Sequence, residues 1–195
     1  MTKPIERPIL FSGEMVRALL EGRKTQTRRI IKPQPDIADP ELEKVLPAAW
    51  EDGFIDVKCP YGIIGDRLWV RETFCAESQQ TIHYRADGWE YDGGGGWKPS
   101  IHMPRWASRI DLEVTAVRVE RLQDISEADA VAEGIESFMQ YGQQAYADYL
   151  KRRHCVYDSR FSFKSLWESI NGFDSWQVNP WVWVIEFRRV PHDQD

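Results

Sequence analysis

The sequence predicts an α+β fold built on a mostly antiparallel sheet, of the kind that closes into a small barrel with flanking helices and loop insertions. Three observations support this class. Strand-like segments outnumber helical ones, the helices do not alternate with strands as they do in parallel α/β folds, and the chain both starts and ends on an apolar strand pattern. With 195 residues, of which 42% are hydrophobic, a single domain over residues 1–195 with generous insertions is the default expectation.

The first elements are a short strand and an amphipathic helix. An apolar run at residues 8–12 predicts a strand, and Ser12 can cap a helix that runs to about Glu21. Gly22 is the natural stop for this helix. The expected apolar stripe consists of Met15, Val16, Leu19 and Leu20. The basic segment Arg23–Lys32 therefore begins just after a helix and is expected to enter a strand.

The central part of the chain alternates between strands and polar insertions. Residues 32–56 are rich in proline and acidic residues and predict a surface excursion, and a turn at 61–66 leads into a strand at 67–74. Alternation places Leu68, Val70, Glu72 and Phe74 on one face of that strand, and Trp69, Arg71 and Thr73 on the other. Residues 76–100 contain the glycine run 93–96, which predicts a loop or hairpin tip.

The last third holds the longest strand signal and three helical segments. The apolar phase slips within residues 109–122, which indicates a β-bulge, a bend or two strands. Residues 126–135 predict a short helix with Ser126 as N-cap and Gly134 as stop. Within 136–160 one more helix is expected around 143–153. The segment 162–172 predicts an amphipathic helix with Phe163, Leu166, Trp167 and Ile170 on its apolar face, and 179–190 a closing strand.

Composition excludes several function classes. A net charge of −6 argues against a protein that coats nucleic acid, although five cations and no acid occur between Arg23 and Lys32. Three cysteines without a CxxC pair, and four scattered histidines, predict neither a disulfide framework nor a metal site, and nothing calls for a cofactor. No apolar run has the length of a signal peptide or a membrane span, so a reduced, soluble, cytoplasmic protein of undetermined oligomeric state is expected.

The stretch "GRKTQTRR" holds the first candidate site residues. Cations near a lysine lower its pKa, and Arg23, Arg28 and Arg29 would do this for Lys24. The alternative is an ordinary solvated basic turn. Thr27 is a possible partner of Lys24, although in a straight strand the two side chains would point to opposite faces and would converge only through a bend. Otherwise Thr27 is simply a β-branched strand residue.

Two carboxylates, one tryptophan and one arginine complete the candidate set. Glu133 lies in the last turn of its short helix, where the helix dipole disfavours a negative charge, so it is either a general acid/base or a solvent-facing residue that tolerates the cost. Glu72 needs a partner on its apolar face, which Arg28 or Lys24 could supply, or it belongs to a structural ion pair or a sheet edge. Trp69 and Arg71 could stack on and clamp a base, or could cover a second layer of core.

Four motifs in this order resemble the ASCH domain family of the PUA-like superfamily of small β-barrels. They are "GRKTQTRR", "GDRLWVRETF", "LQDISEADAVAEGI" and the terminal "VWVIEFRRV". The chain looks like the larger phage and prophage branch, with insertions at about 33–58, 76–100 and 136–160. The resemblance covers roughly half of the chain.

The resemblance implies an activity and a set of residues. Small bacterial members of the family are amidohydrolases that remove the acyl group from N4-acetylcytidine with a Lys, a Thr and a Glu, which match Lys24, Thr27 and Glu133. Lys24 would then take the Thr27 hydroxyl proton, Thr27 would attack the acyl carbon, and Glu133 would protonate the leaving amine. In an alternative scheme, Thr27 orients a water and no covalent intermediate forms.

Two other functions remain open at this stage. A non-catalytic module could bind single-stranded RNA or a modified base, with Arg23, Arg28 and Arg29 on phosphate and Trp69 or Trp97 on a base. A ribonuclease is the third possibility. The length of the chain and its tryptophan-rich strand with Glu72 depart from the small enzymes, so the pocket is expected to differ from theirs.

Overall fold

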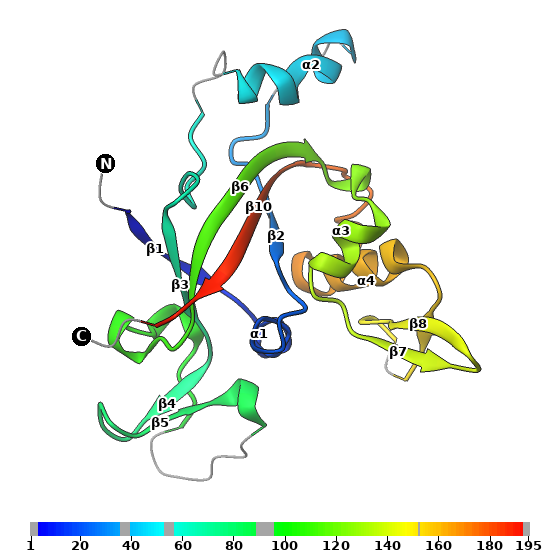
Figure 1. The fold of residues 1–195 in the computed structure, drawn as a ribbon. Helices are drawn as coiled ribbons and strands as arrows, with labels where there is room; N and C mark the ends of the chain where they lie inside the picture. The colour runs from blue at the N-terminus through cyan, green and yellow to red at the C-terminus, as the bar shows by residue number, and fades with distance from the viewer. Residues whose placement is uncertain (1–3, 36–39, 53–56, 89–95, 152, 193–195) are drawn as a thin grey trace. The chain divides into compact units, whose positions relative to one another are not determined.

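The computed structural model describes residues 4–35, 40–52, 57–88, 96–151 and 153–192 (Figure 1). It has a mixed α+β fold, as the sequence predicts. The strands are β1 (Glu6–Leu10), β2 (Gln26–Ile30), β3 (Arg67–Arg71), β4 (Phe74–Ala76), β5 (Ile82–Tyr84), β6 (Asp111–Arg121), β7 (Ser137–Gln140), β8 (Gln143–Ala147), β9 (Cys155–Val156) and β10 (Trp181–Val190). The α-helices are α1 (Gly13–Leu20), α2 (Pro40–Glu51), α3 (Glu127–Ala132) and α4 (Ser159–Asn171).

The main sheet has five strands in the order β1-β3-β6-β10-β2. The pairs β3–β6 and β10–β2 are antiparallel, as expected, whereas β1 and β3 run parallel. In the described part of the chain β1 and β2 form the two edges, so the sheet is open there. Of the two small sheets, β7-β8-β9 lies in the expected insertion at 136–160 and β5 lies in the one at 76–100. The strand expected at 67–74 is divided, and its end belongs to β4.

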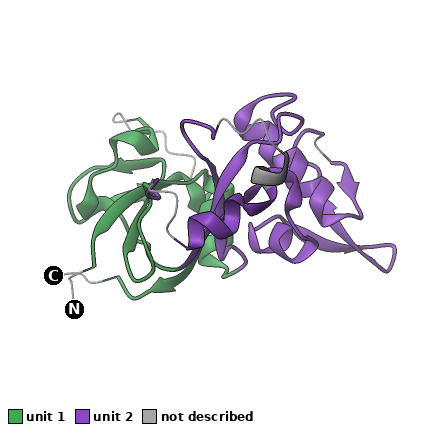
Figure 2. Ribbon diagram, turned by 90° about the horizontal axis from the view of Figure 1, so that it is seen from above, with its two compact units in different colours: residues 1–22, 60–115, 187–195 green, residues 23–59, 116–186 purple. Residues whose placement is uncertain are grey.

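The chain divides into two compact units, which Figure 2 shows in different colours. One contains residues 1–22, 60–115 and 187–195, and the other contains residues 23–59 and 116–186. Both β6 and β10 contribute residues to each unit. The expectation of a single domain stays a prediction.

Several elements form where the sequence places them, for the expected reasons. The Ser12 hydroxyl caps α1 by accepting from the Met15 amide, and Gly22 follows with φ +75°, a conformation in which a side chain is strained. Leu68, Val70, Glu72 and Phe74 are all at most 2% exposed, which confirms the predicted inner face of β3 and its continuation. Residues 181–185 of β10 are buried on both faces.

One further prediction is wrong, and two others gain detail from the structure. The segment 143–153 contains strand β8 and not a helix, because Tyr141 and Gly142 both adopt positive φ and form a two-residue hairpin turn from β7. Residues 40–51, expected in a surface excursion, form α2, whose Trp50 ring packs edge-on against Trp183 at 4.3 Å between centroids. β6 is one continuous strand, which excludes the two-strand alternative and leaves a β-bulge or a bend as the explanation of the phase slip.

The C-terminal helix also differs in detail from its prediction. α4 starts at Ser159, earlier than expected, because the Asp158 carboxylate accepts from the Arg160 and Phe161 amides. Phe163, Leu166 and Trp167 are buried as predicted, but Ile170 is 60% exposed. The predicted glycine run at 93–96 lies mostly outside the described residues. None of the described helices has both the length and the apolar character that crossing a bilayer requires.

Candidate functional site

Lys24 and Glu133 form a buried ion pair in the unit made of residues 23–59 and 116–186. The Lys24 Nζ donates to Glu133 Oε2 at 3.0 Å and to the Glu133 carbonyl oxygen at 2.8 Å. The two side chains are only 2% and 4% exposed. Their backbones also meet as an isolated antiparallel bridge, and the Thr25 amide donates to the Ala132 carbonyl. Main-chain pairing therefore holds both side chains in register.

The short helix α3 positions Glu133 for its contact with Lys24. The Ser126 hydroxyl caps its N-terminus by accepting from the Asp129 amide, and Glu133 is the C-cap residue, as the sequence predicts. Gly134 follows with φ +89° and ends the helix. The unfavourable dipole at this helix end is opposed by two cations, because Arg28 Nη1 donates to Glu133 Oε1 at 3.1 Å while Lys24 holds Oε2.

Arg28 is the centre of a larger carboxylate network. Its guanidinium is fully buried and donates to Glu120, to Asp129 at 3.1 Å and to Glu133. Arg118 extends the network by pairing with Asp129 at 3.2 Å and also with Glu120 and Glu186. The carboxylates become more exposed outward, from 4% at Glu133 to 17% at Glu120 and 25% at Asp129. The network thus connects the buried pair with solvent.

Sequence reasoning missed Glu120 and Asp129. Burial acts to raise the pKa of Asp129, but Arg28 and Arg118 outweigh it and lower that pKa. Two sequence patterns could have identified these residues, strand alternation for Glu120 and the spacing from a helix N-cap for Asp129. Arg118 and Glu120 alternate onto one face of β6, and Asp129 lies three residues after the Ser126 cap, in the first turn of α3.

Burial lowers the pKa of Lys24, and this is the largest of several effects. Glu133 opposes the shift through its charge and its hydrogen bond, whereas Arg29 and Arg28 lower the pKa of Lys24 further. The sequence predicted the direction from the cationic neighbours alone. In the structure, the larger part of the lowering of the Lys24 pKa comes from loss of hydration, which disfavours the charged ammonium.

Thr27 lies in β2 and is 4% exposed, with Ile185 of β10 opposite it. The turn at Glu21–Gly22 precedes Lys24, and the backbone has no further turn or bend between Lys24 and Thr27. Alternation along β2 directs Thr27 to the face opposite Arg28. The bend that the sequence analysis required between the two residues is therefore absent.

Of the remaining arginines of the basic segment, Arg23 donates to backbone carbonyls and Arg29 lies in the main sheet. Arg23 Nη1 donates to the carbonyl oxygens of Gly134 at 2.8 Å and Ile135 at 3.3 Å, just beyond α3. Arg29 is half-buried and pairs across the sheet with Trp183. Arg28, by contrast, is buried between three carboxylates and the Phe163 ring, whose centroid is 5.9 Å from its Cζ atom, and it holds Glu133 in place.

Trp69, Arg71 and Glu72 belong to the other compact unit. Glu72 is paired with Arg109, at 2.9 and 3.1 Å, and not with Lys24 or Arg28 as was considered from the sequence. Arg109 also pairs with Asp87 at 2.7 Å. Burial raises the pKa of Glu72, although Arg109 opposes the shift. The Glu72 carboxylate is thus part of an ion-pair cluster within its own unit.

The indole of Trp69 contacts two guanidinium groups. The Cζ atoms of Arg71 and Arg105 lie 5.4 and 6.0 Å from the ring centroid. Arg71 also donates to the Ile101 carbonyl. In this arrangement the Trp69 ring makes cation–π contacts within its own unit.

The buried pair has the features of an acid–base site. A lysine with a lowered pKa and a carboxylate within hydrogen-bond distance can exchange a proton without rearrangement. Across the described ranges, no three His, Cys, Asp or Glu side chains gather as they would around a metal ion.

Comparison of the chain with protein-family models, with curated proteins and with solved structures finds no match. A functional assignment therefore depends on the residues and their geometry.

Proposed function

We propose that this protein is an ASCH-type amidohydrolase of the PUA-like superfamily, which removes the acyl group from N4-acylated cytosine nucleosides such as N4-acetylcytidine. Within this proposal, the five-stranded sheet is part of the wall of the family's barrel. The observation that supports it most strongly is the buried contact of 3.0 Å between Lys24 Nζ and Glu133 Oε2. These are two of the three residues that the resemblance selects, and they lie 109 positions apart in the chain.

Three properties of the pair suit amide hydrolysis. The lowered pKa of Lys24 increases the fraction of neutral amine, which can act as a base. Glu133 is within reach of Lys24, so a proton can pass between them. Arg28 holds the second carboxylate oxygen of Glu133, which fixes the orientation of the carboxyl group.

The reaction can proceed by two routes from these residues. In the covalent route, Lys24 takes the Thr27 hydroxyl proton and Thr27 Oγ1 bonds to the acyl carbon. The bond between that carbon and N4 then breaks as Glu133 protonates N4, which releases cytidine and leaves the acyl group as an ester on Thr27. Water then hydrolyses this ester to give the free carboxylate and restore the Thr27 hydroxyl. In the second route, Lys24 deprotonates a water that Thr27 orients, and the same two products form in one displacement.

Both routes need Thr27 near Lys24, although Thr27 follows Lys24 with no bend to turn it toward that side chain. The two routes differ in whether Thr27 carries an acyl group during turnover. An acyl group on Thr27, detected by mass spectrometry after rapid acid quenching, would identify the covalent route. Its absence during steady turnover would identify the water route.

The activity is tested by incubating the purified protein with N4-acetylcytidine and, separately, with short single-stranded RNA. We expect release of cytidine and acetate from the nucleoside, measured by liquid chromatography, and no cleavage of the RNA. Cleaved RNA would indicate a ribonuclease. A salt-dependent mobility shift without any product would indicate a binding module, and either result would overturn the proposal.

The rate of deacylation is expected to rise with pH and to level off below pH 10.5, the ordinary pKa of a lysine. The neutral form of Lys24 is the active base, and burial lowers its pKa, so the neutral fraction saturates earlier than for an exposed lysine. A pH profile of kcat measures this directly. A rate that still increases in proportion to hydroxide at pH 10.5 would contradict the assignment of Lys24 as the base.

A further inference from the structure

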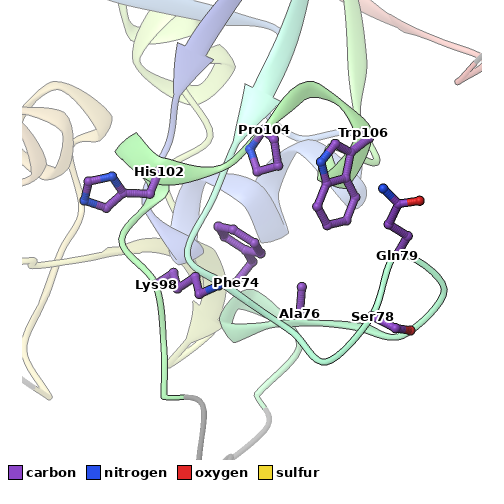
Figure 3. Close-up of a pocket in the computed structure, with 8 residues that line it drawn as sticks. All are labelled: Phe74, Ala76, Ser78, Gln79, Lys98, His102, Pro104 and Trp106. Atoms are coloured by element: carbon purple, nitrogen blue, oxygen red, sulfur yellow. The ribbon is translucent and has the colours of Figure 1, made fainter.

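A pocket of about 490 Å³ lies in the unit that contains β4 and β5, whereas the residues of the proposed reaction belong to the other unit. Its volume lies within the range of roughly 300–1,000 Å³ that is usual for small-molecule sites. The lining residues are Phe74, Ala76, Ser78, Gln79, Lys98, His102, Pro104 and Trp106. Figure 3 shows Phe74 and Pro104 in the middle, Lys98 and His102 toward one end, and Trp106, Gln79 and Ser78 toward the other.

The floor of the pocket is one face of strand β4. Phe74 and Ala76 alternate onto this face, and Ser78 continues the alternation beyond the strand. Phe74 packs on Met103 and Ala107 in a small buried cluster. This packing makes the floor rigid and apolar before any ligand arrives.

Main-chain pairing aligns Lys98 with this floor. The Phe74 amide donates to the Lys98 carbonyl at 3.2 Å, and the Lys98 amide donates to the Phe74 carbonyl at 2.8 Å. Residues paired in this way in an antiparallel bridge project to the same face, so the ammonium of Lys98 is on the side of the Phe74 ring.

Two short 3₁₀ turns form the wall. Ser100–His102 carries His102, and Arg105–Ala107, which follows Pro104, carries Trp106. Trp106 is 49% exposed although tryptophan buries more apolar surface than any other side chain. About half of Trp106 is therefore exposed beside the apolar floor of the pocket.

The charge of the lining has one sign. Lys98 and His102 are its ionisable groups, and none of the eight lining residues is acidic, in a chain with a net charge of −6. Glu77 lies between Ala76 and Ser78 in the sequence, but alternation directs it to the other face, where it pairs with His83 at 3.6 Å. The pocket is thus suited to an anion at the end where Lys98 and His102 lie.

We propose that this pocket binds a small ligand with a planar aromatic ring and an anionic group. The ring stacks on Trp106 above the Phe74 floor, and Lys98 with His102 holds the anion. Gln79 and Ser78 offer donors and acceptors for polar atoms at the edge of the ring. A nucleoside monophosphate and an aromatic carboxylate share this chemistry.

Isothermal titration calorimetry with four probes tests the proposal: adenosine monophosphate, N-acetyltryptophan, adenosine and inorganic phosphate. At least one of the first two, which combine ring and anion, is expected to bind at least about tenfold more tightly than either adenosine or phosphate. Whichever of adenosine monophosphate and N-acetyltryptophan binds more tightly shows whether the preferred anionic group is a phosphate or a carboxylate. Binding of adenosine or phosphate as tight as that of the tighter aromatic anion, or no binding of either aromatic anion, would overturn the proposal.

Variants locate the binding in the pocket. Trp106→Ala and Lys98→Ala are each expected to weaken binding of the aromatic anion about tenfold, because stacking and charge contribute separately. The matched controls are Tyr141→Ala and Lys58→Ala, which remove an exposed aromatic ring and an exposed lysine outside the lining and should leave binding unchanged. Trp106 and Lys98 are exposed, so their variants should fold. Unchanged binding in Trp106→Ala would reject this site.

Discussion

Lys24→Arg is expected to fold, to keep a cation against Glu133 and to lose deacylation of N4-acetylcytidine. Arginine stays protonated at every accessible pH, so it can pair with Glu133 but cannot accept a proton. General base catalysis contributes about 10²–10⁴-fold to a rate, so a decrease in kcat of this size is expected. Steady-state kinetics together with a thermal unfolding curve measure both consequences.

Two further variants make the experiment specific. Lys24→Met removes the charge as well as the base, and should be as inactive as Lys24→Arg while being less stable. Lys151→Met removes an exposed lysine in the same unit and should match the wild type in both measurements. If Lys24→Arg retained full activity, the ion pair with Glu133 would be structural and Lys24 would not be the base.

Glu133→Gln is expected to cause the largest loss of stability of any single substitution at the site. Glu133 is 4% exposed on its side chain and compensates two buried cations, Lys24 and Arg28. Removing one partner of a buried ion pair costs about 3–5 kcal/mol, because the opposite charge remains buried without compensation. Arg28 keeps Asp129 and Glu120 as partners, so most of this cost is expected to come from Lys24. Urea unfolding of the purified variant measures the change in the free energy of unfolding.

The matched control is Glu127→Gln, an exposed glutamate in the first turn of the same helix. It removes the same charge without leaving a buried cation and should change the free energy of unfolding by less than about 1 kcal/mol. A loss below about 1 kcal/mol for Glu133→Gln itself would mean that the buried network relaxes or hydrates when its central carboxylate is lost.

The dependence of stability on pH follows from the same pair. The pKa of Lys24 is lower in the folded protein than its ordinary value of 10.5. Between these two pKa values the unfolded chain holds more protons on Lys24 than the folded one, so this residue makes the free energy of unfolding rise with pH in that window. Below the folded pKa both states carry the charge, and the contribution no longer changes.

Local signals in the sequence were sufficient for elements that depend on neighbours along the chain. The Ser12 and Ser126 caps, the Gly22 and Gly134 stops and the inner face of β3 all follow from residues within a few positions of one another. The hairpin β7–β8 was missed because its turn depends on positive φ angles at Tyr141 and Gly142. Tyrosine rarely adopts a positive φ, so its presence does not predict such a turn. Ile170 was expected to be buried from periodicity, but burial at a helix end depends on what packs there, which periodicity does not contain.

For the candidate site too, the sequence predicted some features and only the structure showed the others. The sequence alone selected Lys24, Thr27 and Glu133 through their motifs, and it predicted a lowered pKa for Lys24 from the surrounding charge. Only the tertiary structure decided that Lys24 and Glu133 are in contact, that Arg28 is enclosed by Glu120, Asp129 and Glu133, and that Glu72 pairs with Arg109. The physical reason is that the partner of a buried charge is determined by the packing of segments that lie 37 to 109 residues apart in the chain. A sequence pattern records which residues need a partner but not which one the fold brings to them.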